Sequence, residues 1–226
     1  GLPLERVEAI DGSVIENPAA RDGLSDGAYA CFLSHRKIWT DIARREDAYT
    51  LVLEDDIHFS GQAHLFLRDG SWIPEGTDIV HLETERERCL VRGGPVLRLH
   101  GRSFFRLAGD CAGAGAYIIS RRFAARLARE FTEIDNHFDI FLFDRGYVES
   151  ARILKIFPAI CIQDRCLNED GMGSDTCVKP PPVPASRKNL AGRLARETAR
   201  LRRQIESGVS SRLDLDRPVE KKIEFK

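Results

Sequence analysis

The sequence predicts an α/β domain built on a mixed, mostly parallel sheet with helices on both of its faces. Apolar runs that suit strands alternate with segments of helical periodicity over residues 34–162, which is typical of this class. One of these runs, Thr50–Leu53, is continuously apolar, as a strand buried on both faces is. Apolar residues make up 42% of the 226 residues, which is enough for one sizeable core.

The other elements follow from their apolar patterns. Residues 34–46 predict a helix because Ile38 and Ile42 fall on one side of it. Ser120 is expected to cap the helix that follows it. In chain order, the further elements are a strand at 78–82, a hairpin of 96–99 and 104–107, a strand at 116–119, helices at 121–130 and 135–147, and a strand at 153–162.

A proline-rich segment divides the chain. Residues 179–184 read Lys-Pro-Pro-Pro-Val-Pro, a stiff spacer that cannot be a helix or a central strand. We therefore expect a domain at 1–178, a linker at 179–186, and a basic amphipathic helix with a tail at 187–226. The whole chain carries 34 Lys and Arg against 35 Asp and Glu, a balance that argues against nucleic acid as a partner.

The basic segment at 187–206 has two interpretations. Its arginines surround leucines at helical spacing, so it could lie on an anionic membrane surface or dock on its own acidic domain. The chain has no apolar run of the roughly 18–20 residues that a membrane span requires, and no secretory leader opens it. These patterns predict a cytoplasmic protein, with peripheral contact at the inner face of the membrane as one option.

The six cysteines match neither a zinc-binding pattern nor a secreted disulfide framework. They predict six reduced thiols in a cytosolic protein. Cys31 and Cys161 lie in apolar surroundings and are expected in the core, and a Cys161–Cys166 pair remains an alternative.

Three consecutive acids follow the buried strand at 50–53. Alternation along a strand would send Glu54 and Asp56 to one side of the sheet and Asp55 to the other. Two carboxylates on one side repel unless a cation lies between them, and Mn²⁺ or Mg²⁺ would resolve that conflict with oxygen ligands. The plainer alternative is a strand end whose acids face solvent.

Several motifs, in order, resemble glycosyltransferase family 25, which includes bacterial lipooligosaccharide galactosyltransferases and collagen galactosyltransferases. The resemblance covers residues 1 to about 175. The matching segments are Gly27–His35, Leu53–Asp56, Asp78–Leu82, Ala116–Arg121, Ile134–Leu142 and Pro158–Asp164.

The resemblance implies a GT-A-like fold and transfer of a hexose, often galactose, from a UDP-sugar to a saccharide or glycolipid acceptor with inversion. Glu54 and Asp56 would then bind the metal ion. Asp139 is expected to be the catalytic base, with Asp144 and Asp110 in reserve, although Asp139 could instead cap its own helix. The residues expected to contact the donor are Ser34, His35, Asp55, Gln163 and Asp164. Each of these could also have a purely structural role.

Two departures from the family pattern favour a second hypothesis. The sequence begins without the strand that usually opens family members, so either the chain is truncated or this form lacks part of its donor site. Ala28 stands where the family often has Glu. Both features would suit a catalytically inactive GT-A-like partner protein. A metal-dependent phosphohydrolase is a third option, but it would require further carboxylate clusters.

Overall fold

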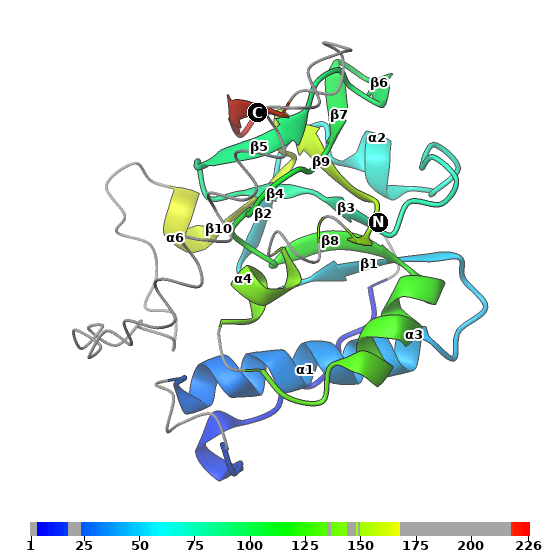
Figure 1. Cartoon of the computed structure of the whole chain (residues 1–226). Helices are drawn as coiled ribbons and strands as arrows, with labels where there is room; N and C mark the ends of the chain where they lie inside the picture. Colours follow the sequence, from blue (N-terminus) through cyan, green and yellow to red (C-terminus); the bar gives the residue numbers. More distant parts are fainter. Residues whose placement is uncertain (1–3, 18–23, 135–136, 144–147, 149, 168–217) are drawn as a thin grey trace, which may run out of the picture.

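A six-stranded sheet forms the centre of the computed structural model, which describes residues 4–17, 24–134, 137–143, 148, 150–167 and 218–226 (Figure 1). Its strand order is β1-β8-β3-β9-β7-β6. The strands are β1 (Tyr49–Leu53), β3 (Ile79–His81), β6 (Leu97–Leu99), β7 (Arg102–Arg106), β8 (Ala116–Ser120) and β9 (Ile153–Phe157). The hairpin expected from 96–107 is confirmed as β6 and β7.

The expectation of a mostly parallel sheet is wrong. Among the described strands of this sheet, β3 and β9 form the one parallel pair, and the other four neighbouring pairs are antiparallel. A continuous apolar run indicates that both faces of a strand are buried. It does not indicate whether the neighbouring strand is parallel or antiparallel. The prediction of a mixed α/β domain holds.

Helical segments cover the two faces unequally. Helices α1 (Asp26–Ile42) and α3 (Arg121–Glu130) pack together on one face, with α4 (Phe138–Leu142) beside them (Figure 1). Their apolar side chains enclose one core cluster with Ile79 and Ile119. The opposite face carries a second cluster, in which Phe66 of the short α2 (His64–Leu67) packs with Val80 and other residues.

Helix α1 begins earlier than the pattern predicted. Ser25 caps it by accepting a hydrogen bond from the backbone N–H of Ala28, so the helix starts at Asp26 and not at residue 34. Helix α3 matches its predicted range, and Ser120 caps it through the N–H of Phe123. Of the helix expected at 135–147, residues 137–143 are described and contain α4, whereas 135–136 and 144–147 lie outside the described residues.

The strand expected at 153–162 is two strands. After β9 the chain passes through a cis Phe157–Pro158 bond and joins a second sheet of order β2-β10-β4. This sheet contains β2 (Ile57–Phe59), β4 (Glu83–Thr84) and β10 (Cys161–Gln163), and the short helix α6 (Asp164–Leu167) follows. The change of sheet carries Gln163 towards the end of β1.

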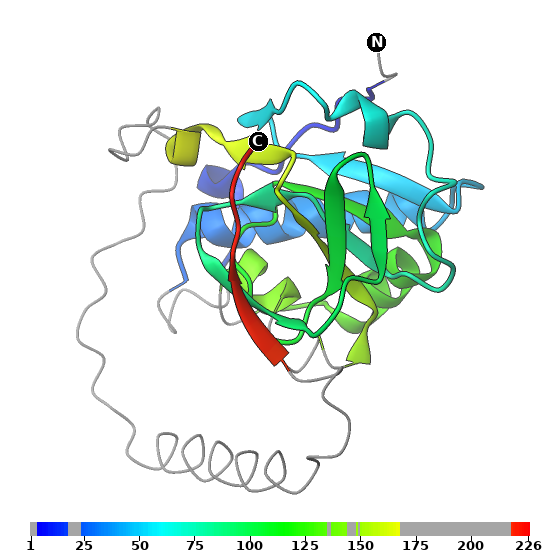
Figure 2. The same ribbon diagram turned by 90° about the horizontal axis from the view of Figure 1, so that it is seen from above.

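The end of the chain belongs to the fold. Strand β11 (Pro218–Lys222) runs antiparallel to β5 (Arg88–Arg92), and Figure 2 shows β11 in red along the edge of the domain. Ile223 is fully buried in the main core cluster. The expectation of a separate tail from 187 onwards is therefore wrong for residues 218–226. The linker at 179–186 and the basic segment at 187–206 lie outside the described residues.

A disulfide contradicts the expectation of six reduced thiols. Cys89 on β5 and Cys111 are 22 residues apart in sequence, yet their Cα atoms lie 5.6 Å apart and their sulfurs are bonded. Sequence spacing alone could not reveal a pairing that the packing of β5 creates. Cys31, Cys161 and Cys166 are free thiols, of which Cys161 is buried as expected and Cys31 is partly exposed.

A short 3-10 turn, Gly12–Val14, precedes α1. Within the described ranges, no helix has the length and apolar character needed to cross a bilayer.

Candidate active site

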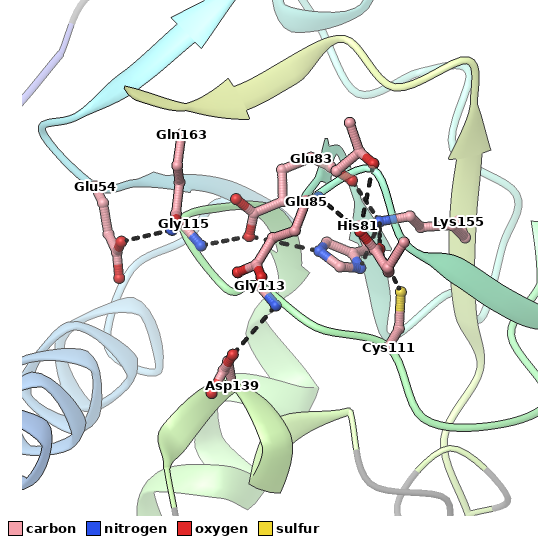
Figure 3. A network of polar contacts seen from close by, with 12 residues as sticks. Glu54, His81, Glu83, Glu85, Cys111, Gly113, Gly115, Asp139, Lys155 and Gln163 are labelled. Atoms are coloured by element: carbon pink, nitrogen blue, oxygen red, sulfur yellow. Dashed lines mark hydrogen bonds and ion pairs between the residues drawn. The ribbon is translucent and has the colours of Figure 1, made fainter. Parts of the chain in front are cut away.

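Carboxylates from three elements converge on the Gly113–Gly115 loop, which leads into β8 (Figure 3). Glu54 follows β1, Glu83 lies on β4, and Asp139 lies on α4. Because β8 is antiparallel to both β1 and β3, its first residue lies at the edge where β1 and β3 end. The loop and these acids therefore share the sheet edge at which the sequence predicted a ligand site.

The acidic triplet leaves strand β1 and enters a turn. Strand β1 ends at Leu53, residues 55–56 form the turn, and β2 begins at Ile57. Strict alternation of side chains therefore does not apply to these three residues. Asp55 is exposed, whereas Glu54 and Asp56 are partly buried.

Three groups hold the Glu54 carboxylate. His35 Nε2 lies 3.4 Å from Oε1, and the Cys31 thiol lies 3.8 Å from the same oxygen. Gln163 donates its amide N–H to Oε2 at 3.0 Å. Burial raises the pKa of Glu54, but the hydrogen bond and charge of His35 and the charge of Arg165 outweigh it, so the pKa lies below its usual value. Glu54 is therefore an ionised and oriented carboxylate.

A hydrogen-bonded chain positions the His35 ring. Trp39 donates its indole N–H to the Tyr117 hydroxyl at 3.0 Å, and that hydroxyl lies 2.9 Å from His35 Nδ1. Phe138 stacks on the imidazole with ring centroids 4.1 Å apart. The two ring nitrogens of His35 thus each face an oxygen, Nδ1 the Tyr117 hydroxyl and Nε2 the Glu54 carboxylate.

Asp56 has an unsatisfied oxygen. Its Oδ1 is buried and has no hydrogen-bond partner among the described residues. Burial raises the pKa of Asp56, and the charge of Glu54 raises it further. An uncompensated carboxylate oxygen beside an ionised carboxylate fits a cation as the missing partner. Glu54 also retains accepting capacity, because each of its oxygens has two lone pairs and its side chain is 30% exposed.

Asp139 faces the glycine loop from α4. Its Oδ2 accepts a hydrogen bond from the backbone N–H of Gly113 at 3.3 Å (Figure 3). Burial raises the pKa of Cys31 and of Glu85, and the negative charge of Asp139 raises both further. The structure thus brings Asp139 to the same edge as Glu54. The reserve residue Asp110 is exposed, and Asp144 lies outside the described residues.

The loop glycines are required by close contacts. A Cβ on Gly115 would lie 2.5 Å from Gln163 Nε2 and 2.9 Å from Ile57 Cδ1. Gly113 has a φ of +83°, and a Cβ there would lie 2.7 Å from Glu83 Oε1. The backbone can therefore approach the buried carboxylate and donate the Gly115 N–H to it at 2.6 Å.

Sequence reasoning missed a buried polar cluster beneath the loop. Glu83, His81 and Lys155 are all fully buried. Lys155 Nζ lies 3.1 Å from His81 Nδ1 and donates to the Glu83 carbonyl oxygen. Burial raises the pKa of Glu83 and lowers that of Lys155, each to about 8. Glu83 could have been found, because like Glu54 it directly follows an apolar strand segment.

The remaining predicted donor contacts have different surroundings. Ser34 faces the N-terminal segment, where its hydroxyl accepts from the Ile10 N–H at 2.9 Å and donates to the Ala30 carbonyl at 2.8 Å. Asp164 Oδ1 lies 2.8 Å from His58 Nε2, within hydrogen-bond distance. Gln163 connects Glu54 with an ion pair. Besides its bond to Glu54, it accepts from Arg165 Nε at 2.8 Å, and Arg165 in turn pairs with Glu85. Thus His35 and Gln163 contact Glu54, and Ser34 and Asp164 bond elsewhere.

Comparisons with known proteins place this chain among the glycosyltransferases. Residues 5–142 match the family model described as glycosyltransferase family 25 (LPS biosynthesis protein). This range includes α1, the acidic triplet, the glycine loop and Asp139. The chain is a glycosyltransferase. It belongs to glycosyltransferase family 25.

Individual relatives agree with this assignment. The chain is 31% identical over 192 residues to the lacto-N-neotetraose biosynthesis glycosyltransferase LgtE of Neisseria gonorrhoeae, covering 77% of this chain and 68% of LgtE. It is 31% identical over 176 residues to LgtB of Neisseria meningitidis serogroup B, covering 72% and 63% of the two chains. The lipooligosaccharide biosynthesis protein lic2B of Haemophilus influenzae is 26% identical over 150 residues, covering 62% and 55%.

Proposed function

We propose that this chain transfers a hexose, with galactose favoured, from a UDP-sugar to a saccharide or glycolipid acceptor in lipooligosaccharide or lipopolysaccharide biosynthesis. The proposal includes a GT-A-like arrangement, a divalent cation and inversion at the anomeric carbon. The names of the relatives support the class of product. The observation that carries the chemistry is the buried, unpartnered Asp56 Oδ1 beside the ionised Glu54.

Glu54 and Asp56 would hold Mn²⁺ or Mg²⁺ in this proposal. Such an ion, when bound, stabilises the negative charge that develops on a departing diphosphate. His35 and Gln163 fix the orientation of the Glu54 carboxylate from opposite oxygens. Glu54 would therefore be a ligand whose orientation is already fixed. Asp56 would be a ligand with an oxygen that no described residue hydrogen-bonds.

Asp139 would accept the proton of the acceptor hydroxyl. An inverting displacement needs a base on the acceptor side, and a positioned carboxylate contributes about 10²–10⁴-fold. Asp139 is partly exposed and lies across the glycine loop from Glu54 (Figure 3). The hydrogen bond from Gly113 holds one of its oxygens, which limits rotation of the carboxylate.

Thermal unfolding with UDP, with and without Mn²⁺, tests the cation site. A ligand that binds only the folded protein at a hundredfold excess over its Kd adds about 2.7 kcal/mol of stability. We expect UDP to stabilise the wild type when Mn²⁺ is present and to lose this effect in Asp56→Asn. Asp47→Asn, which changes an exposed acid away from the site, is the matched control. Equal stabilisation by UDP without a divalent cation would refute the proposed role of Glu54 and Asp56.

The sugar and the acceptor require a product analysis. Mass spectrometry of reactions that combine a panel of UDP-sugars with a glycolipid extract should show a mass increase of one hexose with UDP-galactose. A larger yield with another UDP-sugar would reject the preference for galactose. If the transferred hexose is found only on free saccharides, a glycolipid acceptor is excluded.

We also propose that the enzyme acts in the cytoplasm, at the inner face of the membrane, through residues 187–206. Between Arg187 and Arg203 the sequence has seven basic residues and one acidic residue. Such a segment is attracted to anionic lipid. Deletion of 187–206 should reduce co-sedimentation with anionic vesicles at low salt, and unchanged co-sedimentation would exclude this surface contact.

A further inference from the structure

Three side chains of metal-binding types, those of Cys31, His35 and Glu54, lie close together. The Cys31 thiol, a His35 ring nitrogen and a Glu54 oxygen all lie within 4.8 Å of one another. Cys31 and His35 are four residues apart on α1, so they occupy the same face of that helix. A thiol, an imidazole and a carboxylate together form a donor set that Zn²⁺ prefers and that Mn²⁺ or Mg²⁺ does not.

The spacing of the donor atoms fits a tetrahedral ion. Zinc bonds of about 2.3 Å to sulfur and about 2.0–2.1 Å to nitrogen or oxygen place tetrahedral ligand atoms about 3.3–3.6 Å apart. The structure gives 3.4 Å between His35 Nε2 and Glu54 Oε1, and 3.8 Å between Cys31 Sγ and Glu54 Oε1. The third spacing, between Cys31 Sγ and a His35 ring nitrogen, lies within 4.8 Å.

The supporting contacts of such a site are also present. Histidine ligands of metals usually bond a second group through the other ring nitrogen, which fixes the ring. Tyr117 supplies this bond to His35 Nδ1 at 2.9 Å, and Trp39 in turn bonds the Tyr117 hydroxyl. The His35 ring is buried, while the Glu54 side chain is 30% exposed and leaves a route from solvent.

We propose that Cys31, His35 and Glu54 form a zinc-binding site with three protein ligands and one open position. Binding converts the Cys31 thiol into a thiolate, forms one S–Zn bond and releases one proton to solvent. At Nε2 the metal replaces the proton, and the neutral imidazole then carries its proton on Nδ1 beside the Tyr117 hydroxyl.

The site shares Glu54 with the proposed function but does not depend on it. If Glu54 is also a ligand of the donor cation, Zn²⁺ would compete with that cation and inhibit transfer. Zinc binding itself requires neither UDP nor an acceptor. The two proposals can therefore fail separately.

Cobalt absorption provides a direct test. Co²⁺ replaces Zn²⁺ in such sites, and a cysteine ligand gives a thiolate-to-Co²⁺ charge-transfer band. The purified full chain is titrated with Co²⁺ without UDP and without reductant, so that the Cys89–Cys111 disulfide stays intact. We expect a saturable band at one Co²⁺ per chain, which Zn²⁺ abolishes and an equal concentration of Mn²⁺ leaves unchanged.

Variants assign the ligands. Cys31→Ser should lose the band, and Cys31→Ala serves as a second variant if serine impairs folding. Cys166→Ser is the matched control, because it removes a partly exposed thiol on another helix and should keep the band. Glu54→Gln should keep a thiolate band but bind Co²⁺ more weakly. No band in the wild type, or a band that persists in folded Cys31 variants, would overturn the site.

Discussion

Glu54 donates its backbone N–H to the carbonyl oxygen of Gly115 at 2.7 Å. The N–H of the same glycine donates to the buried Glu83 carboxylate at 2.6 Å. One glycine thus connects the carboxylate that follows β1 with the carboxylate on β4. The position of Glu54 depends on this connection as well as on its side-chain contacts.

Replacement of Gly115 by alanine should disturb this connection. The new Cβ would lie 2.5 Å from Gln163 Nε2, and Gln163 would have to leave Glu54. Overpacking of this kind costs about 1–3 kcal/mol. Chemical denaturation should show that loss together with reduced transferase activity. Gly61→Ala, where a Cβ meets nothing within 4 Å, should change neither, and an equally tolerant Gly115→Ala would contradict the described packing.

His35→Ala should reduce kcat/KM by about 10- to 100-fold, because a partner that orients a ligating carboxylate is removed. The apparent affinity of the enzyme for the divalent cation should fall as well. His64→Ala removes an exposed histidine from α2 and is the matched control. Steady-state kinetics at several Mn²⁺ concentrations measure both effects. Unchanged kinetics in His35→Ala would show that Glu54 needs no support from His35.

Asp139→Asn should lower kcat by about 10²–10⁴-fold if this carboxylate is the base. The binding of UDP should be nearly unchanged, because Asp139 lies on the acceptor side in the proposal. Glu133→Gln, an exposed change that precedes α4 in the chain, controls for loss of charge. A defect in KM for the donor with normal kcat would assign Asp139 to donor binding instead.

Glu83 should make stability depend on pH. Burial raises the pKa of Glu83 to about 8, so at about pH 5–7 the folded protein holds a proton that the unfolded chain releases. Its contribution to stability therefore falls as pH rises, by at most about 1.4 kcal/mol per pH unit. Lys155 stays protonated in both states in this range, because burial lowers its pKa only to about 8.

Urea denaturation at several pH values, compared with Glu83→Gln, isolates this contribution. The stability difference between wild type and Glu83→Gln should shift against the wild type as pH rises. His81, whose pKa burial lowers, is present in both proteins, so its own titration largely cancels. Parallel stability curves for the two proteins would contradict a raised pKa for Glu83.

Removal of the disulfide should destabilise the protein. The bond closes a segment with a sequence separation of 22, for which the loss of chain entropy predicts about 3 kcal/mol. It joins β5 to the segment that leads into the glycine loop, so activity should fall as well. The double variant Cys89→Ser/Cys111→Ser tests this in denaturation, with Cys166→Ser as control. Identical midpoints would show that the bond adds no stability.

Local patterns predicted much of the fold. Helix α3 and its Ser120 cap, the β6–β7 hairpin and the strand before the acidic triplet all depend on neighbours in sequence. Strand direction and the disulfide depend on contacts between distant segments, which a single sequence does not display. The break between β9 and β10 at Pro158 was readable in principle, because proline cannot continue a central strand.

The candidate site was also predicted only in part, because some of its residues follow local patterns and others depend on contacts between distant segments. Glu54 and Asp139 were identifiable as acids at the end of a strand and on a matching helix. The contacts of Ser34 with Ile10, and the burial of Glu83 against Gly115, arise only when separate segments pack. The triplet was expected to extend as a strand, but its turn has a local cause, since Asp favours turns over strands.

The pairing of β5 with β11 has a consequence for biosynthesis. Residues 88–92 leave the ribosome long before residues 218–222, which complete their hydrogen bonding. Until then one side of β5 stays open, and the pocket that Ile223 fills lacks its occupant. The nascent enzyme therefore reaches its native core only when translation of this region is finished, and in the interval this open edge is a surface that a chaperone could protect.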